Sequence, residues 1–514
     1  MSPPSVAIAG AVGSKTTTQP AGPASGEPET REVVNFGGNV RFAPRRYYMP
    51  RTETEVLEIL DLHAGEQIRV VGSRHAWSDG IVSNDVIVDL RHLKQVEIAE
   101  TPDGEVWATV GGGCQIKCLL DELHSRSNST LPTMGLITEQ TIAGAISTAT
   151  HGSGKHSMSH YMAEIRTAAY DSETGRARVY VWNEGDSLRA ARCALGCLGV
   201  ILSVRFRCVP KFLVAERIER CANIEQVLQG EKTHPLQQFF LIPYLWEWMV
   251  QRRSVPDGRG RSWHAGIYRI YWLLSLDIGL HLIVKFLAAV IQSRRLVRWF
   301  YRRAALQIVV KNLTFVDESQ RMLVMKHHLF KHLEIEIFVP GQHLRQATRF
   351  IRDVLTRFDS REGAISDETA ADLRQIGMAD KLQTLAGSFT FHYVITFRRV
   401  LPDETLISTT AGASEPWYAV SFITYVEPRD RFLALADFLL ECMVKLYGAR
   451  PHWGKYCPLS AEAAGELYPR LPEFRAICRR VDPQGAFQNA FVSRVLGIET
   501  RPDAPVEPRG QEGG

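Results

Sequence analysis

Residues 141–154 read TIAGAISTATHGSG and contain almost no large side chain. Two further glycine-rich segments lie in the same half of the chain: residues 70–79 read VVGSRHAWSD, and residues 195–201 read LGCLGVI. Small residues in loops let backbone N–H groups approach an anion closely, as a diphosphate requires. One such segment would indicate only a tight turn, but three in one half of the chain favour a binding site.

None of the three segments has the spacing of a common nucleotide motif. A GxGxxG pattern is absent from all of them, so a nicotinamide Rossmann site is not indicated. The run from Gly152 to Lys155 reads GSGK but lacks the spacing of a phosphate-binding P-loop.

Composition is that of an ordinary globular protein. The 514 residues are 45% hydrophobic and 23% charged, which excludes a disordered or collagen-like chain. A net charge of +4 over this length does not indicate a nucleic-acid partner. Nine cysteines are too few for a disulfide scaffold, and we interpret them as buried thiols in a reducing compartment. We therefore expect an intracellular protein, either cytoplasmic or peripherally associated with a membrane.

Composition and the pattern of predicted strands and helices divide the chain into two α+β parts, with a tail at each end. Residues 1–32 and 499–514 are predicted to be disordered by composition. Residues 38–213 combine short β-branched runs with glycine-rich turns, and residues 53–63 have helical spacing after a capping box that begins at Thr52. Longer strands and helices follow over residues 214–498, interrupted by an insertion at about 255–312.

The insertion contains the most apolar stretch of the chain, residues 267–300. Asp277, His281, Lys285 and Arg294 interrupt it before the roughly 20 residues that span a bilayer, so we expect no spanning helix. Two interpretations remain: a helical pair that packs on the second domain, or a basic amphipathic segment, residues 267–303, that lies on a membrane. The second rests on aromatic residues interleaved with Arg294, Arg295, Arg298, Arg302 and Arg303.

The three glycine-rich segments, taken in their order along the chain, resemble three motifs of the vanillyl-alcohol-oxidase-type flavoproteins. The similarity is greatest to their sugar-lactone oxidase group, which comprises L-gulonolactone oxidase, D-arabinono-1,4-lactone oxidase and alditol oxidase. A fourth match is near the C-terminus, where residues 450–455 read RPHWGK and residues 482–489 read DPQGAFQN. The resemblance covers roughly residues 38–213 and 440–498 and implies a two-lobed fold: a PCMH-type FAD-binding domain and an α+β substrate (cap) domain with a helical insertion.

The resemblance also implies FAD as the cofactor and a set of residues that hold it. His75 stands where the family histidine bonds covalently to the flavin, although Arg74 occupies the position of the usual preceding glycine. The other residues expected to contact FAD or line its groove are Gly72, Ser73, Arg74, Ser78, Thr141, Gly144, Ser147, Gly152 and Ile201.

The substrate side follows from the C-terminal motif and one strand. Lys455 matches the family lysine that reaches substrate hydroxyls, and His452 is its neighbour in the motif. Arg398 matches the cation of a family Glu-x-Arg pair, but Thr396 stands where glutamate is usual. A solvated strand edge is the alternative for Arg398. Loss of the carboxylate removes a strong acceptor for sugar hydroxyls.

A histidine cluster has the spacing of a metal site. His327, His328 and His332 lie close together beside two lysines, which would repel a cation. We therefore predict a solvated basic face and no metal.

These inferences predict an FAD-dependent oxidoreductase. The expected reaction is oxidation of a CH–OH group of a sugar-1,4-lactone by hydride transfer to the flavin, with oxygen as acceptor. The alternatives are a polyol or alditol dehydrogenase with another electron acceptor, an enzyme of lipid-linked sugars, and a non-catalytic flavin binder.

Overall fold

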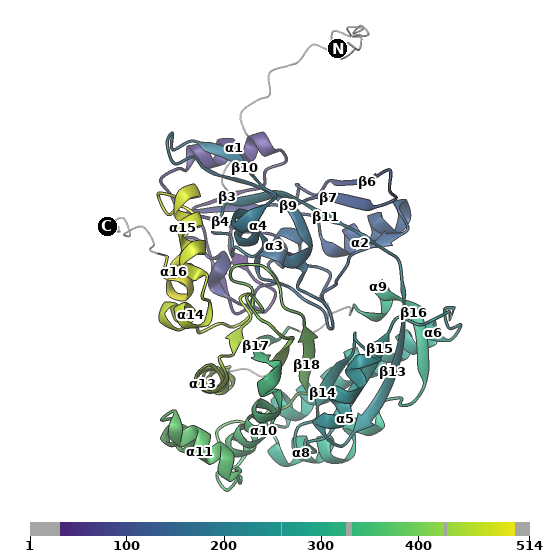
Figure 1. Cartoon of the computed structure of the whole chain (residues 1–514). Helices are drawn as coiled ribbons and strands as arrows, with labels where there is room; N and C mark the ends of the chain where they lie inside the picture. Colours follow the sequence, from purple (N-terminus) through teal and green to yellow (C-terminus); the bar gives the residue numbers. More distant parts are fainter. Residues whose placement is uncertain (1–30, 259, 325–330, 426–428, 499–514) are drawn as a thin grey trace, which may run out of the picture.

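The computed structural model describes residues 31–258, 260–324, 331–425 and 429–498. Residues 1–30 and 499–514, where tails were predicted, therefore lie outside the described part, as do His327 and His328. Helices and sheets are both abundant, which confirms the α+β class, and Figure 1 shows the two lobes.

The first lobe contains two sheets. A parallel sheet has the order β3-β5-β4, with β3 Arg46–Tyr48, β4 Ile68–Val71 and β5 Val86–Asp89. An antiparallel sheet has the order β10-β9-β11-β7-β6, with β6 Val96–Glu100, β7 Val106–Gly111, β9 Met162–Tyr170, β10 Ala177–Trp182 and β11 Val200–Arg207. Two short pairs complete the strands of this lobe: β1 Val33–Val34 with β2 Arg41–Phe42, and β8 Ser129–Thr130 with β12 Val209–Pro210.

Four helices accompany these strands: α1 Glu53–Leu62, α2 Ile116–Arg126, α3 Ile142–Ser147 and α4 Gly185–Arg192. The predicted cap of α1 is present, since the Thr52 hydroxyl accepts a hydrogen bond from the Glu55 backbone N–H at 3.1 Å. The Glu55 carboxylate accepts from the N–H of Arg51 at 2.8 Å, one residue before the position that a capping box uses.

The second lobe is built on one large antiparallel sheet of the order β16-β13-β15-β14-β18-β19-β17-β20. Its strands are β13 Leu213–Cys221, β14 Gln238–Leu241, β15 Trp248–Ser254, β16 Thr314–Glu318, β17 Leu333–Pro340, β18 Ile395–Val400, β19 Trp417–Thr424 and β20 Arg450–Pro451. Apolar side chains of the sheet pack against helices α10 Leu344–Asp359, α11 Asp367–Gln375, α12 Ala379–Leu385 and α13 Asp430–Tyr447, and against α5 Ile224–Gln229. Ile335 and Ile337 of β17 enter this core, so Glu334 and Glu336 point to the opposite face of the sheet.

The chain returns to the first lobe at its C-terminus. Helices α14 Ala461–Leu467, α15 Leu471–Val481 and α16 Ala490–Leu496 lie beside the first lobe in Figure 1. Phe474 and Phe491 belong to the same buried core as Ile59 and Val88. Residues from about 461 onward thus stabilise the first lobe, although they follow the second lobe in sequence.

The insertion forms a helical layer on the second lobe. One continuous helix, Ala265–Val290, comprises α6 Ala265–Trp272, α7 His281–Lys285 and two π-helical stretches, Leu273–Leu280 and Phe286–Val290. Helix α8 Arg294–Arg303 and, beyond β16, the short α9 Ser319–Met322 follow. The long helix has 26 residues and a mean hydropathy of 1.9 over its most apolar window. By length and composition alone, this helix could cross a bilayer. The charged residues that interrupt the apolar stretch in the sequence had indicated the opposite.

Candidate functional site

A cavity of about 290 Å³ lies between the two lobes and brings the glycine-rich segments together. Of the residues predicted to hold the cofactor, those that line it are Gly72, Ser73, Arg74, His75, Ser78, Thr141, Gly144, Ser147 and Ile201. Lys455, Arg398 and His452 line the same cavity from the second lobe. Gly152 does not: it borders a smaller neighbouring pocket, and a Cβ there would meet the Met134 carbonyl oxygen at 2.5 Å.

The first-lobe wall is a close backbone cradle. A Cβ added at Gly72 would lie 2.1 Å from the Thr141 hydroxyl oxygen, so only glycine allows β4 to end against α3. Thr141 is itself the N-cap of α3 and accepts from the Gly144 N–H at 3.4 Å. Glycine here leaves backbone N–H groups at the cavity wall, which suits the diphosphate of FAD.

His75 lies in this cradle with its ring on the cavity wall. The ring stacks on Phe36, with centroids 4.9 Å apart and an interplanar angle of 25°. Arg74 has φ +58°, in the left-handed region where glycine is favoured. This backbone geometry gives a physical reason for the glycine that the resembling proteins carry before the histidine, and the chain here adopts it with arginine. The cradle and the position of His75 both fit FAD.

The second-lobe wall is the face of the large sheet turned away from its helices. The antiparallel register aligns four cavity residues across neighbouring strands, Phe240 with Thr396, Thr396 with Ser421, and Ser421 with Glu336. The row changes from an aromatic side chain to hydroxyls and then to a carboxylate. The wall therefore has an apolar end and a charged end.

Glu336 is the centre of the charged end and is 2% exposed. Its carboxylate accepts a hydrogen bond from Ser421 at 2.9 Å, and the same oxygen lies 3.4 Å from His151 Nε2 and 3.7 Å from Arg398 Nη1. Burial alone would raise the pKa of Glu336, but the positive partners outweigh it and hold the pKa well below its ordinary value. Arg398 is therefore paired inside the cavity wall, and the alternative of a solvated strand edge is wrong.

Lys455 forms a second buried ion pair. Its ammonium contacts the Glu334 carboxylate and lies 4.2 Å from the centre of the Trp77 ring. Burial opposes ionisation of Glu334, but Lys455 overcomes it and lowers the pKa of the carboxyl. His332 lies 3.9 Å from the same carboxylate and is buried, so the solvated basic face predicted around it is wrong for this residue.

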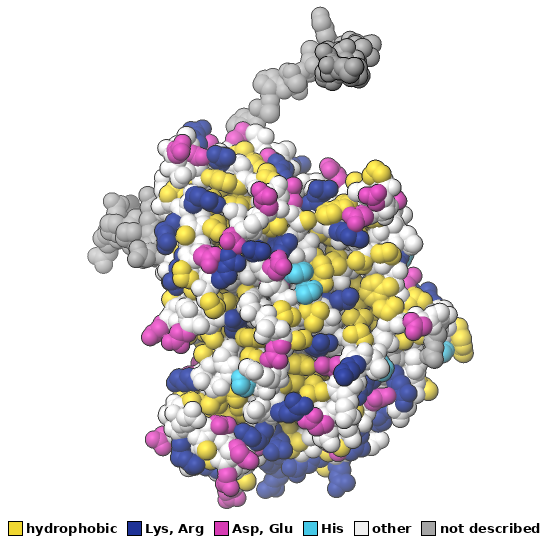
Figure 2. Space-filling view, in the orientation of Figure 1, with side chains coloured by type: hydrophobic (Ala, Val, Ile, Leu, Met, Phe, Trp, Pro, Cys, Tyr) yellow, Lys and Arg dark blue, Asp and Glu magenta, His cyan; other side chains and the backbone are white. Residues whose placement is uncertain are grey.

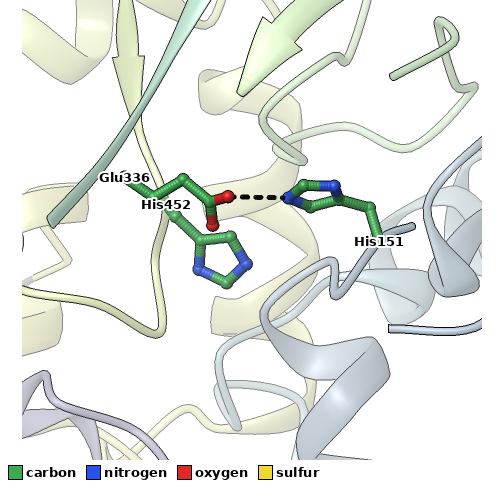
Figure 3. Close-up of side chains that lie close together, drawn as sticks. All are labelled: His151, Glu336 and His452. Carbon is green, nitrogen blue, oxygen red and sulfur yellow. Dashed lines mark ion pairs between the residues drawn. The ribbon is translucent and has the colours of Figure 1, made fainter. Parts of the chain in front are cut away.

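His452 is held in one tautomer. Its Nδ1 accepts a hydrogen bond from the Gly454 N–H at 3.0 Å, so the proton of the neutral ring sits on Nε2. Burial lowers the pKa of His452 to about 3, which keeps the ring neutral near pH 7. Figure 3 shows the Glu336 carboxylate between the His452 and His151 rings.

These three side chains also have the composition of a metal site. One ligand atom from each of His151, Glu336 and His452 lies within 4.8 Å of the others. The Arg398 guanidinium beside the same carboxylate would repel a metal cation. We therefore interpret the trio as a buried hydrogen-bonding and charge network.

The apolar end of the cavity extends into the insertion. It is lined by Phe240, Ile242, Met249, Trp272, Leu280, Tyr301, Ala305, Leu306, Val309 and Val394. His281, on the inner face of the long helix, accompanies them and bonds the Tyr393 hydroxyl at 3.2 Å. We call this end the apolar arm.

Sequence reasoning found the cations of the charged end, Lys455 and Arg398, but missed its two carboxylates and the apolar arm. Glu336 and Glu334 alternate with isoleucines in residues 333–337, LEIEI, and this period of two could have placed both carboxylates on one face of a strand. The insertion was considered only as part of a site for a lipid-linked sugar, and α-helical periodicity would place Trp272 and His281 on opposite faces; the π-helical stretch Leu273–Leu280 between them lets both line the cavity.

Comparisons with known proteins agree with this architecture. A family model described as D-arabinono-1,4-lactone oxidase matches residues 204–495, and one described as FAD binding domain matches residues 44–174. The chain is 46% identical over 464 residues to a long-chain alcohol oxidase of an uncultured marine euryarchaeote, covering 90% of this chain and 96% of that one. It is 26% identical over 470 residues to an L-gulono-1,4-lactone dehydrogenase of Mycobacterium tuberculosis, covering 90% and 98%.

A solved structure has the same fold. Cholesterol oxidase from B. sterolicum superposes with a TM-score of 0.68 at 13% identity, covering 90% of this chain and 96% of that one.

Proposed function

The chain belongs to the D-arabinono-1,4-lactone oxidase family and is an FAD-dependent oxidoreductase of CH–OH donors, and we propose that its substrate is an alcohol with a long apolar chain. The observation that carries this proposal is the apolar arm, which continues from the charged end of the cavity into the insertion. The 46% identical relative named long-chain alcohol oxidase supports the same substrate class. Oxygen is the proposed electron acceptor.

In the proposed complex the hydroxyl lies at the charged end and the alkyl chain fills the apolar arm. The cradle at Gly72, Thr141 and His75 would hold FAD, which would supply the acceptor for the hydride removed from the substrate carbon. The Lys455 ammonium binds the substrate oxygen, and Glu334, kept ionised by Lys455, accepts the hydroxyl proton. Arg398 supplies positive charge where negative charge develops, while Glu336 holds its guanidinium in place.

His452 has a positioning role beside these charges. Because Gly454 fixes its Nδ1 as an acceptor, Nε2 presents an N–H that can donate to an oxygen at the charged end. The side chains of the two ion pairs are largely buried, so each charge acts in a lower dielectric than bulk water.

The dependence of the rate on the length of the alcohol's alkyl chain is the direct test of the proposed substrate. Burial of one CH₂ group contributes about 0.8 kcal/mol, so kcat/KM should rise about fourfold per carbon until the arm is full. Purified holoenzyme would be assayed for peroxide with primary alcohols of increasing length and with aldonolactones. A flat profile with alcohols, together with rapid lactone oxidation, would refute the proposal.

A variant of the arm sharpens this test. Ala305→Phe places a ring in the apolar arm, and kcat/KM for the longest alcohols should fall at least about tenfold while short alcohols are little affected. Ala304→Phe is the matched control, because Ala304 is not among the lining residues.

A sugar-1,4-lactone is the second candidate substrate. The buried charges at one end of the cavity suit the hydroxyls of a sugar, and the 26% identical relative is named for a lactone. Thr396 in place of a carboxylate, next to Phe240 in the sheet, weighs against it. The ratio of kcat/KM for a long-chain alcohol to that for L-gulono-1,4-lactone separates the two candidates.

We also propose that FAD is bound covalently through His75. The support is the place of His75 on the cavity wall, in the backbone cradle that fits the cofactor. Acid precipitation should leave the flavin in the protein pellet of the wild type and release it from His75→Ala. Free flavin from the wild type would refute the covalent bond and leave the fold unaffected.

Residues 267–303 are, in addition, the proposed site of peripheral membrane contact. The support is a row of exposed apolar side chains along the long helix.

A further inference from the structure

The long helix of the insertion presents two different faces. Its outer face carries six aliphatic or aromatic side chains that are each 52–68% exposed: Ile267, Ile270, Leu274, Leu282, Phe286 and Val290. Spacings of three, four and eight residues keep them on one side of the helix. Large apolar side chains that are exposed along one side of a helix mark an interaction surface.

The inner face of the same helix belongs to the cavity. Trp272, Leu280 and His281 line the apolar arm, while Tyr268 donates a hydrogen bond to the buried Glu216 at 2.6 Å. A helix is about 10 Å across with its side chains. Within the described residues, this helical layer therefore separates the apolar arm from the exposed row.

Cations and an indole flank the exposed row on α8. Arg295, Arg302 and Arg303 are exposed on this helix together with Trp299. Figure 2 shows Lys and Arg side chains gathered at the lower edge of the molecule, where α8 lies in Figure 1. Arginine and tryptophan beside an apolar surface suit the headgroup region of an anionic bilayer.

Not all the arginines that were predicted to contact a membrane point away from the protein. Arg294 donates to the Gly387 carbonyl at 2.7 Å, and Arg298 pairs with Asp359 at 2.8 Å. These two anchor α8 to the second lobe. Arg302 also donates to the Tyr244 carbonyl, at 3.3 Å, so Arg295 and Arg303 are the arginines that this packing turns outward.

The helix rests along the lobe and does not leave it to cross a bilayer. Tyr268 near its start bonds Glu216, and His281 in its second half bonds Tyr393. Ala265 and Val284 are also buried against the lobe. These attachments along its length orient the apolar row parallel to a membrane surface.

We propose that this outer face of residues 265–303 lies on an anionic bilayer, and that the alcohol substrate passes from the bilayer into the apolar arm directly behind it. The second part rests on the proposed oxidation of long-chain alcohols. A hydrophobic alcohol is concentrated in the bilayer, so delivery from there avoids its transfer through water.

Vesicle flotation tests the membrane contact. Wild-type holoenzyme should float with phosphatidylcholine/phosphatidylglycerol vesicles at low salt, and less with phosphatidylcholine alone or at high salt. Ile270→Glu/Phe286→Glu and Arg295→Glu/Arg303→Glu should each reduce the bound fraction at least about tenfold, as one apolar side chain or one charge contributes about 1 kcal/mol or more. Leu62→Glu, which changes an equally exposed leucine on α1, should bind like the wild type.

Substrate delivery needs a separate measurement on the same variants. With dodecanol embedded in the anionic vesicles, both double variants should lose at least about tenfold in kcat/KM, while water-soluble butanol should be oxidised within twofold of the wild type. Equal loss on both alcohols, or lost flotation without slower oxidation of the embedded alcohol, would overturn the delivery route.

Two further outcomes separate this inference from the proposed function. If the wild type oxidises dodecanol in detergent but neither floats nor prefers vesicles, the membrane inference fails and the proposed function stands. If it floats but oxidises no alcohol, the function and the delivery route fail and the contact stands.

A concentration-dependent dimer that the Ile270→Glu/Phe286→Glu variant abolishes, without flotation, would assign the face to a second copy of the chain and overturn the proposal.

Discussion

Replacing Glu336 by Gln removes the charge at the centre of the buried network and preserves its shape. Gln can still accept the hydrogen bond from Ser421, but Arg398 loses its counter-charge and His151 loses its carboxylate partner. Removing one partner of a buried ion pair typically costs about 3–5 kcal/mol. Because the Arg398 side chain is 14% exposed and the two charged groups are 3.7 Å apart, we expect about 3 kcal/mol, the lower end of that range.

Thermal unfolding of the holoenzyme, followed by tryptophan fluorescence, gives the readout. For a lobe of this size, 1 kcal/mol corresponds to roughly 2–4 °C in Tm, so Glu336→Gln should lower Tm by roughly 6–12 °C at pH 7. The control is Glu225→Gln, which removes a carboxylate from an exposed pair with Arg345, where solvent screens the charges. Its Tm should stay within about 2 °C of the wild type.

The effect of Glu336 also has a defined pH dependence. Its folded pKa lies below the ordinary 4.5, so the unfolded chain takes up the proton first as pH falls. The carboxylate therefore stabilises the fold fully above pH 4.5 and progressively less below it. The Tm difference between wild type and variant should be constant from pH 8 to pH 6 and shrink below pH 4.5. A difference under 2 °C at pH 7, or one that grows on acidification, would refute the assigned pairing.

Three other changes test separate parts of the site. Lys455→Met should slow anaerobic flavin reduction by substrate roughly 100-fold, about 3 kcal/mol. It should also destabilise the fold by removing the lysine counter-charge of the buried Glu334, and adding Glu334→Gln should restore stability but not rate. Gly72→Ala should lose bound flavin, measured by absorbance, because its Cβ would meet the Thr141 hydroxyl at 2.1 Å, and Thr141→Ala in the same chain should recover part of it. Burial lowers the pKa of His392 to about 4, so the wild type should lose stability as pH falls from 6.5 toward 4, by at most about 1.4 kcal/mol per unit, and urea unfolding of His392→Gln should lack this loss.

Local sequence patterns were enough to identify the glycine-rich segments and the first capped helix of the first lobe. The three glycine-rich segments and the capped helix after Thr52 depend on short-range backbone requirements, and the structure has the cap and brings the segments to one cavity. Gly152 was assigned to the cofactor groove by its place in a motif, yet it packs against the Met134 carbonyl. A linear motif identifies a loop but does not determine which of its residues face the cavity.

The charged wall needed contacts that no local pattern contains. Glu336 and Arg398 are 62 residues apart in sequence and become partners because β19 pairs with both of their strands. His332 shows a different error. The lysines next to it in the sequence suggested a solvent-exposed side chain, but the fold buries His332 beside Glu334.

By itself, the sequence determined the α+β class, the flavoprotein resemblance and the glycine-rich segments that meet at the cavity, because tight turns and helix caps depend on neighbours within a few positions. Only the tertiary structure determined the substrate wall, since strand register across the large sheet sets which side chains meet. It also gave the insertion its two faces: the sequence left open whether residues 267–303 pack on the second domain or lie on a membrane, and packing on the second lobe determined which side of the long helix lines the cavity and which remains exposed.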